Sequence, residues 1–263
     1  MGCGRKIGPY DCCTIITDDC LHVMAEIPDG IVKLIVTSPP YNNHENKRSS
    51  GGDKPAWRPA LRNIEYGSFD DEMPEDEYQA WQQRVILEML RIVKADGTVA
   101  YNHKNRIRNW GIISPLSWIL PVANVRQEIV WDRGNSPQVS PVRFLPTTER
   151  VYLIGEGRPH FKPEHLIDKE VWHIPPAIWD GIPSFPEPLV ERLIDALCPD
   201  NGLVADFFVG SGTTPAVARR MGHHFFGCDI NSDMAERARE RVRNTQPPLF
   251  VMQPEQLPLV GAR

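Results

Sequence analysis

Short apolar runs alternate with amphipathic stretches along this chain of 263 residues, and this alternation restricts its fold more than any other feature. The clearest run extends from Ile31 to Thr37 and is typical of a strand that is buried on both faces. From Glu75 to Val93 the apolar residues instead recur at helical spacing, as on the buried stripe of an amphipathic helix, which Ala95-Asp96-Gly97 is expected to end. Strands that alternate with helices predict an α/β fold built on a doubly wound, mostly parallel sheet.

The same patterns predict the remaining elements. Strands are expected at 13–17, 97–102, 125–131, 149–154, 203–208 and 225–229, and helices at 19–27, 186–197, 213–221 and 232–242. Three segments do not fit this pattern. Residues 42–70 are polar and rich in Gly, Pro and Arg, which predicts a mobile loop; residues 155–183 predict an insertion rather than core; and residues 245–263 predict a Pro-rich tail. We therefore expect a single domain over residues 1–244.

Composition argues against several classes of protein. The net charge of −5 disfavours a protein that coats nucleic acid indiscriminately, although it leaves room for a local basic face. The longest apolar stretch, 111–125, is interrupted by Ser and Pro, and the first residues lack the apolar core of a signal peptide, so we expect a cytoplasmic protein without a membrane span. The six cysteines show no paired CxxC spacing, so no metal is expected, and Cys3, Cys12 and Cys13 form only a weak cluster.

A loop with two glycines, Asp206-Phe-Phe-Val-Gly-Ser-Gly-Thr-Thr214, joins a predicted strand to a predicted helix. Glycines let the backbone approach a ligand closely, and N–H groups at a helix start bind polar or anionic groups. Asp229 ends the next predicted strand, where a carboxylate can accept both hydroxyls of a ribose. No Lys follows the glycines and the third glycine of the dinucleotide fingerprint is missing. An adenosine-containing ligand is therefore predicted; the alternative is a tight turn followed by a helix-capping Asp.

A second loop, Thr37-Ser-Pro-Pro-Tyr41, follows the apolar strand at 31–37. Its prolines stiffen the turn and remove N–H donors, which leaves carbonyl oxygens to point into a cleft. A carbonyl and the Ser38 hydroxyl suit an exocyclic amino group, and Tyr41 offers a flat face for a base. Both loops follow strands of a parallel sheet, whose ligands bind at the carboxyl ends, so we expect one shared site. The alternative is a rigid loop whose Tyr packs on the core.

With the loops in this order, the chain resembles the beta class of amino-group DNA methyltransferases, in which the catalytic motif precedes the cofactor motif. Ser38, Pro39, Pro40 and Tyr41 match the catalytic motif, and residues 206–214 match the cofactor loop, with Phe207 in place of the usual proline. The likeness covers about residues 14–244. It implies a circularly permuted, Rossmann-like methyltransferase sheet in which the insertion at 155–183 serves as a short target-recognition segment.

The resemblance also implies S-adenosylmethionine as the cofactor, with no metal. Asp229 takes the place of the ribose-binding acidic residue, and Asp19 lies in an element expected near the adenine. Where the family often has His-Pro before its Phe-Pro motif, this chain has Ile182-Pro183. The cofactor-binding residues that the resemblance implies are Asp19, Thr37, Phe185, Pro186, Asp206, Phe208, Gly210, Ser211, Gly212, Thr213 and Asp229.

The implied activity is site-specific methylation of an exocyclic amino group on a base that is flipped out of duplex DNA. Tyr41 would stack on the base while Ser38 and the Pro39 carbonyl accept hydrogen bonds from the amine, so catalysis would rest on positioning and electrostatics. In this family Ser at position 38 slightly favours cytosine N4 over adenine N6. Double-stranded DNA is the implied partner, a homodimer is plausible by analogy, and restriction–modification is the implied setting.

DNA contacts are expected on a basic surface around the cleft. This surface would draw on the loop at 42–70, on the cluster of basic residues at 104–108 and on the segment 155–183. The specific candidates are Lys47, Arg48, Arg58, Arg106 and Arg143. Four arginines on the last helix are expected instead to be solvated or in ion pairs, namely Arg237, Arg239, Arg241 and Arg243.

Three alternatives stay open at this point. A methyltransferase of the same fold that acts on RNA or on a protein side chain carries related loops, although the motif order argues against it. A non-catalytic protein that binds an adenosine ligand would need only the glycine loop. A nicotinamide-dependent oxidoreductase is disfavoured because the glycine loop lacks the third glycine.

Overall fold

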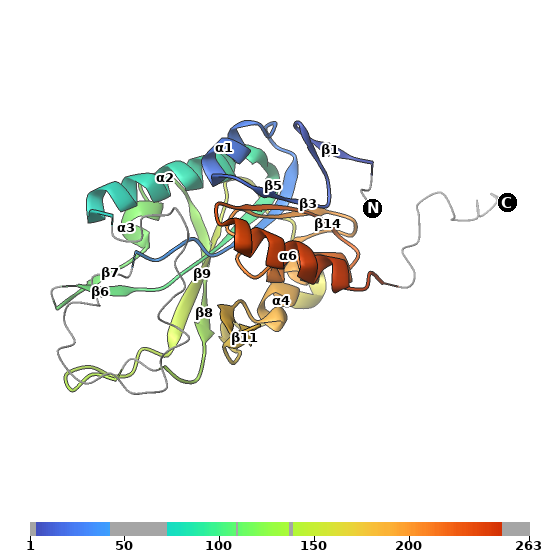
Figure 1. Cartoon of the computed structure of the whole chain (residues 1–263). Helices are drawn as coiled ribbons and strands as arrows, with labels where there is room; N and C mark the ends of the chain where they lie inside the picture. Colours follow the sequence, from blue (N-terminus) through green and yellow to red (C-terminus); the bar gives the residue numbers. More distant parts are fainter. Residues whose placement is uncertain (1–3, 43–72, 109, 137–138, 249–263) are drawn as a thin grey trace.

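The computed structural model describes residues 4–42, 73–108, 110–136 and 139–248 (Figure 1). Its centre is an eight-stranded sheet in the order β10-β8-β9-β5-β4-β13-β14-β3, and helices cover both faces. Most of the expected mobile loop at 42–70 lies outside the described residues, as does the tail from 249 onward. Three of the expected DNA contacts also lie there, namely Lys47, Arg48 and Arg58.

All strands of this sheet run in the same direction except β9, which is antiparallel to both of its neighbours. A mostly parallel sheet with helices on both faces confirms the predicted α/β class. In sheet order, the strands are β10 (Val171–His173), β8 (Val125–Asp132), β9 (Thr148–Ile154), β5 (Val93–His103), β4 (Val32–Thr37), β13 (Leu203–Asp206), β14 (His224–Asp229) and β3 (Thr14–Thr17). Two-stranded hairpins are formed by β1 (Lys6–Ile7) with β2 (Tyr10–Asp11), β6 (Arg106–Arg108) with β7 (Gly111–Ile113), and β11 (Ala177–Trp179) with β12 (Ile182–Ser184).

The helices form two groups, one on each face of the sheet (Figure 1). The first group comprises α1 (Cys20–Ala25), α2 (Glu75–Ile92) and α3 (Leu116–Ile119), and the second comprises α4 (Glu187–Leu197), α5 (Thr213–Arg220) and α6 (Ser232–Asn244). A 3-10 turn, η2, spans Pro163–His165. Within the described part of the chain, no helix has both the length and the apolar character needed to cross a bilayer.

Each helix group buries its own apolar cluster against the sheet. On α2 the predicted stripe is buried, and all six residues of β4 are buried between the two clusters. Lys33 lies within β4 and stays paired there, because its ammonium reaches the Asp96 backbone oxygen at 3.0 Å and the Asp96 carboxylate at 2.5 Å. A charge inside a double-faced strand is tolerated only with such a partner.

Ala95-Asp96-Gly97 was expected to end the helix before the next strand. The structure differs, because α2 ends at Ile92 and β5 begins directly at Val93, so these three residues lie within the strand. A register shift between Val32 and Leu34 accommodates the early start of the β4–β5 pairing. Gly97 lies close to the neighbouring strand: a Cβ there would come within 2.7 Å of the Lys33 carbonyl oxygen. The glycine therefore serves close strand packing rather than helix termination.

The expectation that residues 155–183 lie outside the core is wrong for part of that segment. Its strand β10 pairs with β8 and completes one edge of the sheet. Trp172 on β10 is 7% exposed and packs in the apolar cluster beneath α4 to α6, and the Arg192 guanidinium lies 4.4 Å from its ring centroid. Burial of this indole means that the segment contributes to the stability of the domain.

Candidate functional site

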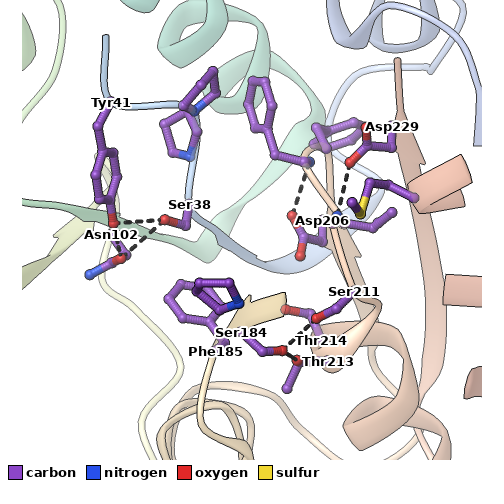
Figure 2. Close-up of a pocket in the computed structure, with 18 of the residues that line it drawn as sticks. Ser38, Tyr41, Asn102, Ser184, Phe185, Asp206, Ser211, Thr213, Thr214 and Asp229 are labelled. Carbon is purple, nitrogen blue, oxygen red and sulfur yellow. Dashed lines mark hydrogen bonds between the residues drawn. The ribbon is translucent and has the colours of Figure 1, made fainter. Parts of the chain in front are cut away.

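The two predicted loops lie side by side, because β4 and β13 are hydrogen-bonded neighbours and both loops follow carboxyl ends. Together with residues from β5, β12 and β14 they line one cavity of about 310 Å³ (Figure 2). The predicted residues that line it are Asp19, Ser38, Pro39, Pro40, Tyr41, Phe185, Asp206, Phe208, Gly210, Ser211, Thr213 and Asp229. The expectation of one shared site is therefore met.

One half of the cavity holds the Ser38 hydroxyl and the Asn102 amide beside Tyr41 (Figure 2), together with the Glu149 carboxylate. The Tyr41 hydroxyl lies 2.7 Å from Asn102 Oδ1, 3.0 Å from Glu149 Oε2 and 2.9 Å from Ser38 Oγ. Ser38 Oγ also reaches Asn102 Oδ1 at 3.1 Å. Because a phenol carries one proton, Tyr41 donates to only one of the two acceptors at a time. The cluster therefore presents more acceptor than donor capacity.

A hydrogen bond to the backbone fixes the orientation of the Asn102 side-chain amide. Its Nδ2 donates to the Arg150 carbonyl at 3.0 Å, so Oδ1 is the atom that faces Ser38 and Tyr41. Glu149 is likewise fixed, because Oε1 pairs with Arg133 at 2.9 Å while Oε2 meets the Tyr41 hydroxyl. Two buried acceptors thus point toward the predicted catalytic loop.

Sequence reasoning missed Asn102, Glu149 and Arg133 as site residues. Asn102 could have been found, because it lies near the carboxyl end of a parallel strand, where ligands of such sheets bind. Glu149 lies near the start of the antiparallel strand β9, so only the pairing of β9 with β5 and β8 brings it to this edge.

The Tyr41 ring packs beside His103, with ring centroids 4.5 Å apart, and the Lys104 ammonium lies 5.1 Å from its centroid. The ring is nevertheless half-exposed and lines the cavity. The ring therefore packs on its neighbours, as the alternative interpretation predicted, and part of its surface faces the cavity. The carbonyls of the loop differ from expectation at Pro40, whose oxygen accepts from the Tyr78 hydroxyl at 2.7 Å and does not serve as a cleft acceptor.

Asp206 lies in the glycine-loop half of the cavity and is buried, with 3% of its surface exposed. Its Oδ1 accepts from the Thr37 hydroxyl at 2.7 Å and from the Phe208 N–H at 3.0 Å. Burial raises the pKa of this carboxyl from 3.8 to about 6, against hydrogen bonds that lower it. Thr37 does not line the cavity, so its part is to hold Asp206.

The two glycines have separate structural parts. Gly210 (φ +48°) donates its N–H to Asp229 Oδ2 at 2.9 Å, and Asp229 Oδ1 accepts from the Asn231 N–H at 2.9 Å. Gly212 (φ +80°) packs against α6, where a Cβ would come within 2.7 Å of the Ala238 Cα. Burial raises the pKa of Asp229, whose oxygens each retain a lone pair for a ligand hydroxyl.

A buried arginine joins α6 to the glycine loop. Arg241 donates to Thr213 Oγ1 at 2.9 Å and to Glu187 Oε1 at 2.7 Å, and it is 8% exposed. Thr213 and Ser211 also contact the Ser184 hydroxyl (Figure 2). The arginines of the last helix were expected to be solvated or in ion pairs. Arg241 does form an ion pair with Glu187, but it is buried and also donates a hydrogen bond to Thr213 of the glycine loop.

Two further predicted site residues, Pro186 and Arg106, do not line the cavity. Pro186 occupies the N-cap position of α4 and does not line the cavity. Arg106 is 7% exposed, donates twice to the Glu75 carboxylate at 2.7 and 2.8 Å, and lies 4.7 Å from the Tyr78 ring centroid. The expectation that Arg106 contacts DNA is not supported, because its guanidinium is buried and paired with Glu75. Arg143, in contrast, is exposed.

Known proteins resemble this chain in sequence and in structure. The chain is 24% identical over 261 residues to the type II methyltransferase M.BglII from Bacillus subtilis, covering 84% of this chain but only 66% of that protein. Among solved structures, the cytosine-N4-specific PvuII DNA methyltransferase matches at a TM-score of 0.65 and 18% identity, over 90% of this chain and 89% of that one.

A protein from Thermus thermophilus, assigned as a DNA modification methylase and solved with S-adenosyl-L-methionine, also matches at a TM-score of 0.65. Its identity is 20%, over 90% of this chain and 95% of that one. These structural likenesses concern the fold. The sequence model of a family described as DNA methylase, the N6/N4 methyltransferases, matches residues 32–180 and 182–240, which is most of the chain. The chain therefore belongs to the DNA methylase family.

Proposed function

We propose that this protein transfers a methyl group from S-adenosylmethionine to the exocyclic amino group of a base in double-stranded DNA. The observation that carries the proposal is the shared cavity, in which the acceptor cluster around Tyr41 faces the carboxylates of the glycine loop (Figure 2). Family membership supports it, as does the likeness to a methylase solved with this cofactor. The order of the loops supports a circularly permuted methyltransferase.

The residues of the glycine-loop half fit this cofactor by their chemistry. Asp229 keeps lone pairs for the two ribose hydroxyls, Asp19 is held as the cap of α1 with Oδ1 accepting the Leu21 N–H at 2.8 Å, and the Asp206 carboxylate suits the ammonium of the methionyl group. Phe185 supplies an apolar wall. When bound, the cofactor supplies an electrophilic methyl group on a sulfonium.

The acceptor cluster would bind and orient the base. As an amino nitrogen forms its new bond to carbon it gains positive charge, which nearby acceptors stabilise. Ser38 Oγ and Asn102 Oδ1 are the candidates that would face this nitrogen, while Glu149 adds negative charge behind the Tyr41 hydroxyl. Tyr41 would stack on the base once it has left the duplex. Ser38 slightly favours cytosine N4 over adenine N6 through the family pattern.

The test is transfer of labelled methyl groups from S-adenosylmethionine to duplex DNA, followed by digestion and mass analysis of the nucleosides. We expect N4-methylcytosine as the product. N6-methyladenine as the product would still support methylation of an amino group in DNA but would refute the preference for cytosine. Tyr41→Ala is expected to abolish transfer while cofactor binding persists; a non-catalytic adenosine-binding protein would show no transfer in either form. Labelling of RNA or protein in place of duplex DNA would refute the proposed substrate.

DNA binding is proposed to involve exposed Arg143 together with residues of the loop at 42–70, as phosphate contacts that position the duplex. Arg143→Ala should weaken binding about equally for all sequences and should reduce the salt slope by about one. Arg106→Met should leave that slope unchanged if the protein stays folded, because Arg106 is buried on Glu75. Sedimentation of the free and DNA-bound protein would test whether it acts as a homodimer.

A further inference from the structure

A cluster of two thiols and an imidazole lies at the opposite end of the sheet from the cavity. Cys12 Sγ and Cys13 Sγ are 3.6 Å apart, Cys13 Sγ is 4.0 Å from His224 Nδ1, and all three atoms lie within 4.8 Å of one another. We propose that Cys12, Cys13 and His224 bind one zinc ion that fastens the N-terminal hairpin to the central sheet. No metal was expected from the sequence, because only the fold brings His224 to the adjacent Cys12 and Cys13.

Two of the three interatomic distances, Cys12 Sγ to Cys13 Sγ and Cys13 Sγ to His224 Nδ1, are close to those of a tetrahedral zinc site, and the third is within 4.8 Å. With Zn–S near 2.3 Å and Zn–N near 2.05 Å, tetrahedral angles place two sulfurs about 3.8 Å apart and a sulfur about 3.6 Å from a nitrogen. The observed 3.6 and 4.0 Å differ from these values by a few tenths of an ångström, which side-chain rotation supplies. Thiolates with an imidazole favour zinc over hard cations such as magnesium and calcium.

Backbone conformation brings the two sulfurs together. In an extended strand consecutive side chains point to opposite faces, so adjacent cysteines would not normally meet. Cys13 has φ +62°, a left-handed conformation that is uncommon and costly for a residue with a side chain. The Cys13 N–H nevertheless remains bonded to the Phe225 carbonyl at 2.8 Å, next to His224. The strained residue thus holds both thiols beside the imidazole.

The surroundings suit a structural rather than a catalytic ion. Cys12 is fully buried in the larger apolar cluster, whereas Cys13 and His224 are half-buried, which leaves a path for metal entry. His224 begins β14 and Asp229 ends it, so the cluster lies about 16 Å from the cavity residue Asp229 along the strand. No disulfide joins the cysteines among the described residues.

Three ligands come from the described residues, and zinc sites usually have four. Water can complete the set. The zinc ion would link the β1–β2 hairpin to the start of β3 and β14, because Cys12 directly follows β2 and His224 begins β14. Metal binding would then stabilise this end of the domain by linkage to folding.

The test is metal analysis of the full chain purified under reducing conditions, with Cys12→Ser, Cys13→Ser and His224→Ala as variants. We expect about one zinc per wild-type chain and at least a tenfold loss of affinity in each variant. Cys198→Ala, a buried thiol in the other apolar cluster, and exposed His22→Ala are matched controls that should keep the metal. Wild-type protein without zinc, or zinc retained by the Cys12 and Cys13 variants, would overturn the proposal.

A second measurement keeps the test independent of variant folding. Cobalt titrated into metal-free wild-type protein should give thiolate-to-cobalt charge-transfer bands, and X-ray absorption of the zinc form should show sulfur and imidazole nitrogen neighbours. Two sulfur neighbours and one imidazole nitrogen are the expected protein ligands. Absence of thiolate bands, or a shell of oxygen alone, refutes the site. Hydrogen exchange at residues 4–13 should rise when zinc is removed.

Discussion

Asp206 offers the sharpest test of how the cofactor half of the cavity is built. Replacement by Asn keeps the shape of the side chain and an oxygen that can accept from the Thr37 hydroxyl and the Phe208 N–H. It removes a charge that burial makes costly, since the pKa of Asp206 is raised to about 6. We therefore expect Asp206→Asn to stabilise the ligand-free protein while it removes the partner proposed for the methionyl ammonium.

The expected size follows from the pKa of the folded and unfolded chains. A carboxyl with a pKa near 3.8 when unfolded and about 6 when folded binds protons more tightly in the native state. The wild type therefore loses stability as pH rises between these values, to a total of about 3 kcal/mol above pH 6. Asn does not titrate, so the advantage of Asp206→Asn should be about 1 kcal/mol at pH 4.5 and about 3 kcal/mol at pH 8.

The assay is urea unfolding of both ligand-free proteins at these two pH values, with unfolding free energies obtained by linear extrapolation. Asp200→Asn is the control, because that carboxylate is 89% exposed, and its effect should stay within about 0.5 kcal/mol. S-adenosylmethionine binding, measured by calorimetry, should be lost or greatly weakened in Asp206→Asn. Equal stability of the two proteins at pH 8, or a more stable wild type, would refute the argument from burial.

Three further substitutions test other parts of the site and the core. Tyr41→Phe removes the hydroxyl that meets the acceptor cluster and should lower kcat at least about tenfold at unchanged cofactor affinity; an unaltered kcat would contradict this. Arg241→Met should cost about 2 kcal/mol in urea unfolding by unpairing buried hydroxyls, against less than about 0.5 kcal/mol for exposed Arg243→Met. Trp172→Ala should cost about 3–5 kcal/mol, whereas 74%-exposed Ile178→Ala should be nearly neutral; equal effects would place Trp172 outside the core.

Much of the fold could be predicted because local periodicity marks its longer strands and helices. The helix at Glu75–Ile92 and the strand at Val32–Thr37 agree with expectation to within a residue or so, since their burial depends on one stripe or on both faces. The short strand β10 was missed, because three residues carry too little periodicity. Its place became visible only through pairing with β8.

Some residues of the candidate site could also be selected from the sequence, whereas others could be judged only in the structure. Ser38, Tyr41 and Asp229 could be selected from sequence because glycines, prolines and carboxylates at strand ends have distinctive local chemistry. Arg106 could not be judged in this way, since any arginine looks solvated until its partner is known. Glu75 lies 31 positions away, and only the packing of α2 against β6 reveals that the two are paired.

The class of sheet, the two loops that meet at its edge and their order could all be read from the chain, because they depend on residue types at neighbouring positions. Folding in three dimensions settles which carboxylates are buried, which arginines are already paired and that Asn102 and Glu149 face Tyr41. It also brings Cys12 and Cys13 to His224, across more than 200 positions of chain. Such contacts arise from strand pairing between distant segments, which local periodicity does not encode.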